Sequence, residues 1–308
     1  MKNEGSGKFD FVGKIGLFGG ISVALVAVSL IYLAVRGLTY GIDFAGGTEI
    51  QVKFEGQVGI ENVRSMSEKL GLTNVHVQGF GEQNEFIIRF QSEQGKTDKE
   101  TNDRQNAAVA KLKEAINTEL GAAKPDIRRV DSVGPQVGSD LKRSGLLAIF
   151  YSLLVILIYV GLRFDYNYAP GAVLCLAHDA IITMGIFVFV GKEVNISILA
   201  AILTLIGYSL NDTIVVFDRI RETEHLYQDK GIRFVINKAI NDMFERTLIT
   251  SGTVFTSAAA LYVFAGGTVS DIAFALCVGI LFGTYSSIYV AAPSILLMEK
   301  LKLVKRAA

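Results

Sequence analysis

The chain has 308 residues, half of them apolar, and its 30 Lys and Arg residues balance its 30 Asp and Glu residues. A zero net charge leaves no basic excess to neutralise phosphates, which argues against a nucleic-acid-binding protein. The apolar residues are gathered in several long blocks, a distribution typical of membrane proteins.

The N-terminal end consists of a polar tail, residues 1–14, followed by the first apolar block, residues 15–35. This block is long enough for about one bilayer crossing. It is too long for the core of a secretory signal peptide, and no convincing cleavage site precedes Arg36. We therefore expect a retained first transmembrane helix.

Residues 37–140 are polar and of mixed charge, without a membrane-length apolar run. Alternating apolar residues near the end of 40–54 predict a strand there, and Gly46-Gly47 indicates a tight turn or a close backbone approach. The later patterns predict a helix at 61–70, strands at 75–77 and 86–90, a helix at 103–120 and a strand at 127–133. The order β-α-β-β-α-β is ferredoxin-like, so we expect a soluble α+β domain between the first and second spans.

Five more apolar blocks predict a total of six transmembrane helices. The further spans are expected at 145–162, 169–190, 196–217, 248–265 and 272–298. Pro293 is expected to kink or end the last span. Residues 218–247 are expected to form a loop with an amphipathic helix, lying on the membrane surface or against the bundle. A second tail follows at 299–308.

The distribution of Lys and Arg predicts the orientation in the membrane. The loop 218–247 contains six basic residues and the tail 299–308 contains four, whereas the short loops on the other side contain only Lys192. Both termini are therefore expected in the cytoplasm of a multi-pass protein of the cytoplasmic membrane. The domain at 37–140 is expected on the exterior side.

The sharpest candidate functional residue is Asp212, which lies with Asn211 in a nearly unbroken apolar run. An aspartate in a membrane span costs about 2.5–3.5 kcal/mol on insertion scales, and such residues are usually functional. Helical spacing places Tyr208, Asp212 and Arg219 on one face. Asp212 could relay protons as its access to water changes, or it could be a static partner of a buried cation or a solvated residue near the head groups.

Two further residues could act with it. Asp179 lies near the middle of its span beside His178, where it could be a second relay site or a hydrogen-bonding staple between helices. Arg246, at the start of the fifth span, could extend to the head groups or neutralise Asp212. The run of small polar residues after it, which includes Thr250 and Ser251, could allow close helix packing or line a hydrated path.

Enzymatic chemistry is not indicated by any motif. The three histidines fall in three different compartments, so we expect no metal site, and no nucleotide-binding or nucleophile motif predicts a cofactor or a hydrolase.

Six stretches of the chain carry a resemblance to the SecF family of bacterial protein export. They are YGIDFAGGTEIQV (40–52), RVDSVGPQVGSDL (129–141), LRFDYNYAPGAV (162–173), AHDAIITMGIF (177–187), LTLIGYSLNDTIVVFDRIRE (203–222) and RTLITSGT (246–253). They extend through nearly the whole chain, and the GIDFxGG and NDTIVVFDRIRE segments are long and specific. The resemblance implies one six-helix half of an RND-superfamily bundle, with SecD supplying the other half.

The resemblance also implies a function and roles for residues. It implies a SecDF complex that uses the proton-motive force to assist preprotein translocation through SecYEG, with YajC and YidC as further candidate partners. It assigns proton passage to Asp212, makes Arg246 a functional candidate and leaves Asp179 with a less defined role. The residues Tyr208, Asn211, Thr213, Thr250 and Ser251 are expected to support the polar path. The competing functions are a small-molecule or lipid proton antiporter of the same superfamily and a non-transporting scaffold of the translocon.

Overall fold

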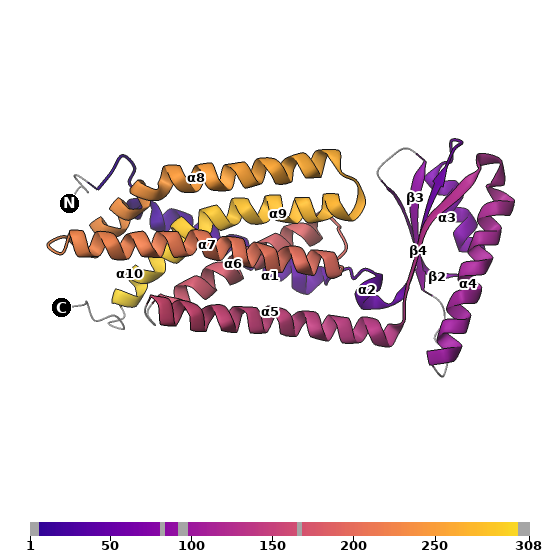
Figure 1. The fold of residues 1–308 in the computed structure, drawn as a ribbon, viewed down its shortest axis with the longest axis horizontal. Coiled ribbons are helices and arrows are strands. Elements are labelled where there is room, and N and C mark those ends of the chain that lie inside the picture. The colour runs from indigo at the N-terminus through magenta and orange to yellow at the C-terminus, as the bar shows by residue number, and fades with distance from the viewer. Residues whose placement is uncertain (1–5, 81–83, 92–97, 165–167, 301–308) are drawn as a thin grey trace.

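The computed structural model describes residues 6–80, 84–91, 98–164 and 168–300. A bundle of long helices occupies most of the long axis of the molecule, and a small sheet domain lies at one end of it (Figure 1). The polypeptide passes from the first bundle helix into the sheet domain and then returns to the bundle.

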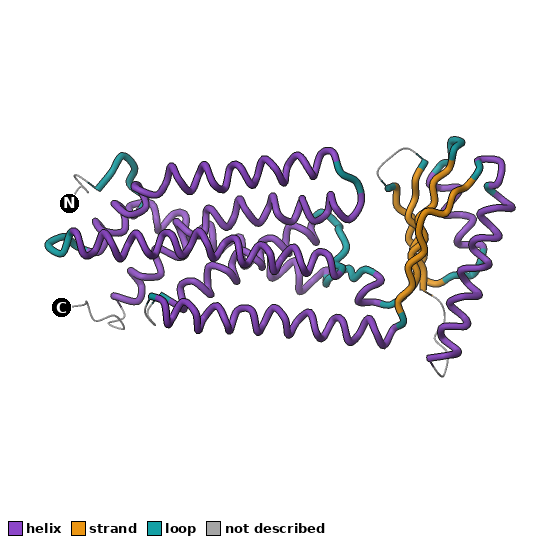
Figure 2. The backbone as a smooth tube through the Cα atoms, viewed as in Figure 1, coloured by secondary structure: helices purple, strands orange, loops and turns teal. Residues whose placement is uncertain are grey.

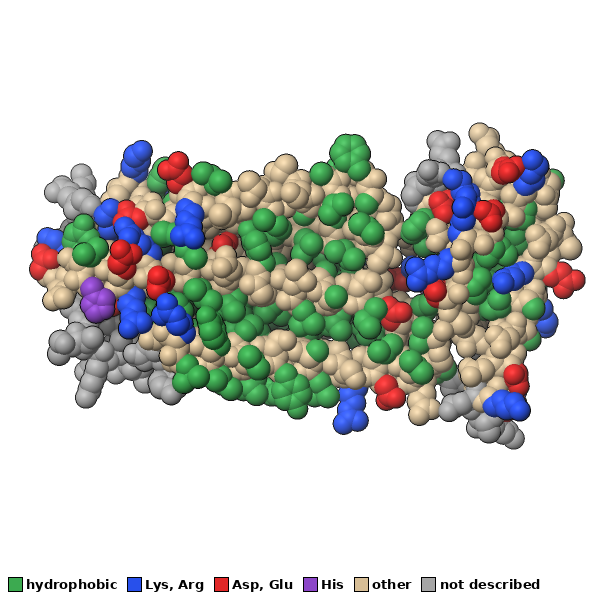
Figure 3. Space-filling view, viewed as in Figure 1, with side chains coloured by type: hydrophobic (Ala, Val, Ile, Leu, Met, Phe, Trp, Pro, Cys, Tyr) green, Lys and Arg blue, Asp and Glu red, His purple; other side chains and the backbone are tan. Residues whose placement is uncertain are grey.

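Six helical segments in the described part of the chain are long and apolar enough to cross a membrane, which confirms the predicted number of spans. The bundle helices are α1 (Ile15–Arg36), α5 (Pro135–Arg163), α6 (Ala169–Phe189), α7 (Ile196–Leu226), α8 (Ile232–Phe264), α9 (Gly267–Ser286) and α10 (Ala292–Lys300). Figure 3 shows an apolar belt around the middle of the bundle, with charged side chains at its far end and on the sheet domain. This distribution fits a bundle whose middle lies in the hydrocarbon core.

The sheet domain has the predicted β-α-β-β-α-β order. Its elements are β1 (Gly47–Phe54), α3 (Ile60–Lys69), β2 (Thr73–Gly79), β3 (Glu85–Gln91), α4 (Asp98–Glu119) and β4 (Pro125–Val133). The four strands lie in the order β2-β3-β1-β4, and every neighbouring pair is antiparallel. The fold is therefore the expected ferredoxin-like α+β domain between the first and second spans.

One face of this sheet is apolar and the other is polar. Alternate residues of β1, Ile50, Val52 and Phe54, are buried under α3 and α4, where Leu112 and Ile116 pack against them. Figure 2 shows the sheet between these two helices and the bundle. The period-2 alternation thus leaves the polar face of the sheet directed toward the bundle.

Several predicted element boundaries differ from the structure. Within 40–54 only the later part is a strand, since β1 begins at Gly47 and Ile42–Ala45 before it form a short helix, α2. α5 begins at Pro135, well before the apolar block, because proline is favoured in the first turn of a helix. The polar residues that follow Pro135 can be helical because this part of α5 lies outside the membrane. The predicted tail at 299–308 lies largely outside the described residues.

The expected loop at 218–247 is mostly helix. α7 continues to Leu226, and α8 begins at Ile232 and runs without a break into the membrane span. The predicted amphipathic face packs against the bundle, since Val235 and Ile236 are buried beside Phe11. Its apolar residues are therefore covered by protein rather than by lipid head groups.

Pro293 coincides with a change in helix geometry. The last span passes through a π-helical turn, Ser287–Ala291, before α10 begins. A proline cannot donate to the carbonyl one turn before it, and a wider turn removes the resulting clash. The predicted kink therefore takes the form of a π-turn.

Close packing of α9 on α7 depends on Gly279. A Cβ atom at this position would lie 2.3 Å from Cδ1 of Leu205, which is itself buried. Four residues later, a Cβ at Gly283 would lie 3.4 Å from the side chain of Ser209 and 3.6 Å from Asp179 Oδ2. Small residues at this spacing let two membrane helices approach closely.

We predict that Gly279→Ala destabilises the bundle by about 1–3 kcal/mol, because the added methyl group overpacks a filled interface. The apparent Tm, measured by heating followed by gel filtration in detergent, should fall. Gly20→Ala is the matched control, since no atom lies within 4 Å of a Cβ built there. A Tm for Gly279→Ala equal to that of Gly20→Ala would contradict the packing argument.

Candidate functional site

Asp212 lies on α7 at the interface with α8. Its side chain is buried, and its Oδ2 atom accepts a hydrogen bond of 3.0 Å from the hydroxyl of Ser251 on α8. This bond is its only direct hydrogen bond within the described residues. The carboxyl group is therefore held in place by one neutral donor and has acceptor capacity left for water or a proton.

Tyr208 lies one helical turn before Asp212. Its hydroxyl is buried beside Ser251 and Asp212 and has no hydrogen bond of good geometry with any described residue, although the Ser251 side chain is near enough to interact with it. A buried hydroxyl without a partner is costly unless water or another group reaches it. Tyr208, Asp212 and Ser251 thus form a small polar cluster between α7 and α8.

Arg246 lies about one turn before Ser251 on α8. It is exposed and forms no ion pair within the part of the chain that the structure describes, although its charge acts on the Asp212 carboxyl group. The structure thus leaves Arg246 near Asp212 without direct contact. Arg219, expected on the face of Asp212, instead bonds to Glu222 at 2.8 Å and to Asp242 at 2.7 Å.

The other supporting residues do not join this cluster. Asn211 and Thr250 are exposed, and Thr250 donates to the backbone carbonyl of Arg246 at 3.0 Å. Thr213 is buried on a different side of α7, 3.6 Å from the sulfur of Cys175 on α6. The residues predicted to form one path therefore divide among an interior cluster, the outer surface and a second interior site.

That second site is centred on Asp179 of α6, which is almost completely buried. Its Oδ1 atom lies 2.8 Å from Nδ1 of His178. Its Oδ2 atom accepts hydrogen bonds from Ser209 on α7 at 2.5 Å and from Ser286 on α9 at 2.8 Å. Ser286 in turn accepts a hydrogen bond of 3.0 Å from Cys175. One carboxylate thus connects three helices through four polar side chains.

The first helix is attached to the same region through aromatic contacts. The ring of His178 stacks on Tyr285 of α9, with 6.2 Å between the ring centroids. The Tyr285 hydroxyl donates to the carbonyl of Phe18 at 2.6 Å and accepts from Ser22 at 3.0 Å, both on α1. Nε2 of His178 is buried and has no hydrogen-bond partner among the described residues.

The sequence patterns did not identify Ser209, Ser286 or Cys175 as parts of this site. The available signal was weak, since Ser209 stands three residues before Asp212 and Ser286 lies in an apolar block. Single serines are common at membrane helix interfaces. Only the crossing of α6, α7 and α9 brings their hydroxyls to one carboxylate.

The sheet domain is connected to the bundle by a polar junction. Arg89 of β3 bonds to Glu49 of β1 at 2.5 Å and also pairs with Glu193, which belongs to the connection between α6 and α7. Burial alone would lower the pKa of Arg89, but the charges of Glu49 and Glu193 raise it above its ordinary value. Arg89 is therefore a fixed cation that bridges the sheet and the bundle.

A second part of the junction depends on backbone contact. Gly46 and Gly47 both have positive φ angles, +72° and +133°. A Cβ at Gly46 would lie 2.9 Å from Cα of Pro135 in the first turn of α5, and a Cβ at Gly47 would lie 2.8 Å from the carbonyl oxygen of Phe90. Only glycine allows α2, β1 and α5 to meet this closely.

Comparison with known proteins gives matches over nearly the whole chain. The family model described as "Protein export membrane protein SecD/SecF, C-terminal" matches residues 112–301, and the "SecD/SecF GG Motif" model matches residues 31–58. The chain is 40% identical to the protein translocase subunit SecF of Calditerrivibrio nitroreducens over 98% of this chain and 97% of that relative. It is 44% identical to SecF of Magnetococcus marinus over 94% of this chain and 92% of that relative.

The crystal structure of SecDF, a translocon-associated membrane protein from Thermus thermophilus, has a similar fold. The match has a TM-score of 0.83 and 32% sequence identity, and it covers 95% of this chain. It covers 39% of the SecDF chain, so the present chain spans less than half of that protein.

We predict that Asp179→Ala destabilises the bundle more than Asp179→Asn does. The alanine variant leaves the buried Ser209 hydroxyl without its acceptor, which costs about 1–3 kcal/mol, whereas the Ser286 hydroxyl can still donate to the Gly283 carbonyl at 3.0 Å. The asparagine variant keeps the side-chain volume and one oxygen. Apparent Tm values should fall in the order wild type, Asp179→Asn, Asp179→Ala.

The control for this series is Asp140→Asn, which removes an exposed carboxylate from the polar first turns of α5. Its Tm should equal that of the wild type. Equal Tm values for the two Asp179 variants would show that the hydrogen bonds to this carboxylate do not hold the helices together.

Proposed function

Because the chain belongs to the SecD/SecF family of protein-export membrane proteins, we propose that it acts as the SecF half of a SecDF complex. In this proposal it uses the proton-motive force to assist the translocation of preproteins through SecYEG across the cytoplasmic membrane. The observation that carries the mechanism is Asp212, a carboxyl group buried between two membrane helices with a single hydrogen-bond donor among the described residues.

The proton acts on the packing of α7 against α8. A charged Asp212 is disfavoured between apolar helices unless water or a cation reaches it, whereas a protonated Asp212 is tolerated there. Loading and releasing a proton therefore changes the relative free energies of two arrangements of the helices. The membrane potential supplies about 2.3 kcal/mol per proton for each 100 mV.

The path beside Asp212 requires a second subunit in this proposal. Asn211, Arg246 and Thr250 are exposed on the outer surface of the chain, although they stand near Asp212 in sequence or in space. Exposing polar side chains to the hydrocarbon of lipid costs free energy, so we expect another protein subunit to cover this surface. SecD fits this role, since the solved SecDF chain is much longer than the match to the present one.

Movement of α7 has a direct connection to the sheet domain. The first residue of α7, Ile196, donates its N–H to the Asp43 carboxylate of α2 at 3.0 Å. α2 continues through Gly46-Gly47 into β1, and the connection before α7 carries Glu193, the partner of Arg89. A shift of α7 would therefore be transmitted to the sheet through two adjacent contacts. The sheet domain would serve as the mechanical coupling element.

The proposed orientation places the sheet domain on the exterior side. The turn between α7 and α8 lies at the end of the bundle far from the sheet. Basic residues are concentrated around this turn, among them Arg221, Lys230 and Arg233. Basic residues concentrate on the cytoplasmic side of membrane proteins. Both tails would then be cytoplasmic, because α1 and α10 have their outer ends near that turn (Figure 1).

We predict that Asp212→Asn abolishes proton-dependent export while the complex still assembles. Asparagine keeps the volume and an oxygen for Ser251 but cannot change its charge. Translocation of a preprotein should be measured in membrane vesicles with and without an uncoupler. The rate with this variant should equal the rate in vesicles that lack the chain, and the uncoupler should have no further effect.

Asp218→Asn is the matched control, because Asp218 lies on the same helix and is exposed near the surface. It should export at the wild-type rate. If Asp212→Asn also exported at the wild-type rate while deletion of residues 37–140 did not, the chain would be a scaffold and the proton relay would be refuted.

We predict that a cysteine at Asp126, in β4, reacts with a membrane-impermeant maleimide added to intact spheroplasts. A cysteine at Lys230, in the turn between α7 and α8, should react only after the membrane is permeabilised. The background contains Cys175→Ser and Cys277→Ser. The reverse labelling pattern would invert the proposed orientation without affecting the family assignment.

A further inference from the structure

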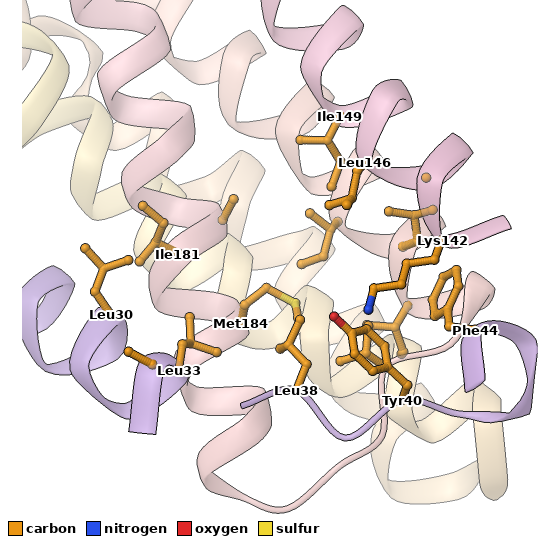
Figure 4. Close-up of a pocket in the computed structure, with 17 residues that line it drawn as sticks. Leu30, Leu33, Leu38, Tyr40, Phe44, Lys142, Leu146, Ile149, Ile181 and Met184 are labelled. Atoms are coloured by element: carbon orange, nitrogen blue, oxygen red, sulfur yellow. The ribbon is translucent and has the colours of Figure 1, made fainter. Parts of the chain in front are cut away.

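A cavity of about 550 Å³ lies in the bundle at the end that includes Tyr40 and Phe44, just before the sheet domain in the chain. Figure 4 shows the side chains that line it. Its wall is apolar, and typical contributors are Leu30 and Leu33 of α1, Leu146 and Ile149 of α5, Ile181 of α6 and Ile202 of α7. The volume falls within the range of about 300–1,000 Å³ that is usual for small-ligand pockets. Neither Asp212 nor Asp179 is among its lining residues.

The cavity exists because α1 and α5 both pack on α6 rather than extensively on each other. The slot between them has α6 and α7 as its floor. Leu30 and Leu146, at its outer edge, are 48% and 63% exposed. Both helices are candidate membrane spans, so the slot opens toward the surroundings of the bundle, where hydrocarbon is the natural solvent.

Lys142 introduces a positive charge at the end of this apolar slot. Its Nζ atom lies 3.9 Å from the centre of the Tyr40 ring, and Figure 4 shows the ammonium group above this ring. Within the described parts of the chain, no carboxylate pairs with Lys142. Lys192, at the same end of the bundle, differs because it is paired with Asp271. Lys142 is therefore a half-buried cation stabilised by an aromatic ring but without an anion.

An elongated apolar slot with one unneutralised cation at its end matches an amphiphile with an anionic head group. We propose that the cavity binds an anionic phospholipid of the bilayer, with one acyl chain between α1 and α5 and its phosphate against Lys142. The position of Lys142, in the polar first part of α5 just before the apolar run begins at Gly145, fits the level of the head groups. The site requires no part of the proton relay, so it stands independently of the proposed function.

The test uses the full chain co-expressed and purified with a SecD subunit in mild detergent. Native mass spectrometry measures binding of phosphatidylglycerol and, separately, of phosphatidylethanolamine. We expect tighter binding of phosphatidylglycerol by the wild type. Lys142→Gln should weaken that binding about fivefold, as expected for the loss of one cation near anionic lipid, and remove most of the preference.

Arg143→Gln is the matched control, because it removes the next cation on the same helix, which is exposed and does not line the cavity. It should keep the wild-type affinity. Ile149→Trp should fill the cavity and weaken binding of both lipids. Equal phosphatidylglycerol binding by the two charge variants would overturn the proposal, and this comparison does not depend on how well the tryptophan variant folds.

A second measurement identifies the occupant directly. A photo-reactive benzoylphenylalanine in place of Leu146, at the edge of the cavity, should crosslink to phospholipid in membranes. An adduct with SecD or with a second copy of the chain would show that protein covers the slot, and it would refute the lipid site.

Discussion

A carboxylate inside an apolar helix bundle must be stabilised by neighbouring side chains, and the two buried aspartates of this chain differ in how far this is achieved. Asp179 is contacted by His178, Ser209 and Ser286, so both of its oxygens have polar partners. Asp212 has one hydrogen-bond partner in the part of the chain that the structure describes, Ser251. Buried polar groups with full sets of partners rigidify a structure, whereas incompletely satisfied ones are costly and often have a functional role. In the proposed mechanism, this contrast gives Asp179 a structural role and makes Asp212 the group that gains and loses the proton.

Helix α7 is the element on which both sites depend. One side of it presents Ser209 to Asp179, and an adjacent side presents Asp212 to Ser251 on α8. Its first residue is bonded to Asp43 of α2, which leads directly into the sheet. A change in the protonation of Asp212 would therefore act on a helix that is hydrogen-bonded at its middle to the bundle core and at its first residue to α2, which leads into the sheet domain.

The junction between sheet and bundle combines two kinds of constraint. Gly46 and Gly47 bring backbones together where any side chain would clash, which fixes the distance between α2, β1 and α5. Arg89 adds charge pairing with Glu49 and Glu193. Together they make a short and polar connection, in contrast to the open apolar slot between α1 and α5 on the side of the bundle. In the proposed lipid site, an acyl chain would fill this slot at the same level along the bundle as the junction.

The six apolar spans, the order of the elements in the sheet domain and the aspartates in two spans can all be read from the linear sequence. The spans and strands follow from the local periodicity of apolar residues. The two aspartates stand out because charge in hydrocarbon is costly and therefore rare in apolar runs. The GIDFxGG and NDTIVVFDRIRE segments also sufficed to indicate the family. Element ends were less well determined, since α5 and α8 extend beyond their apolar blocks, where hydropathy carries no signal.

The set of polar residues that meet, by contrast, depends on how the helices pack in three dimensions. Thr213 was expected beside Asp212 but lies against Cys175, and Thr250 and Asn211 point to the surface. Ser209 and Ser286, which are unremarkable in the sequence, surround Asp179. The physical reason is that a hydroxyl reaches a carboxylate only over about 3 Å, and that distance depends on how helices cross and rotate rather than on spacing along one chain.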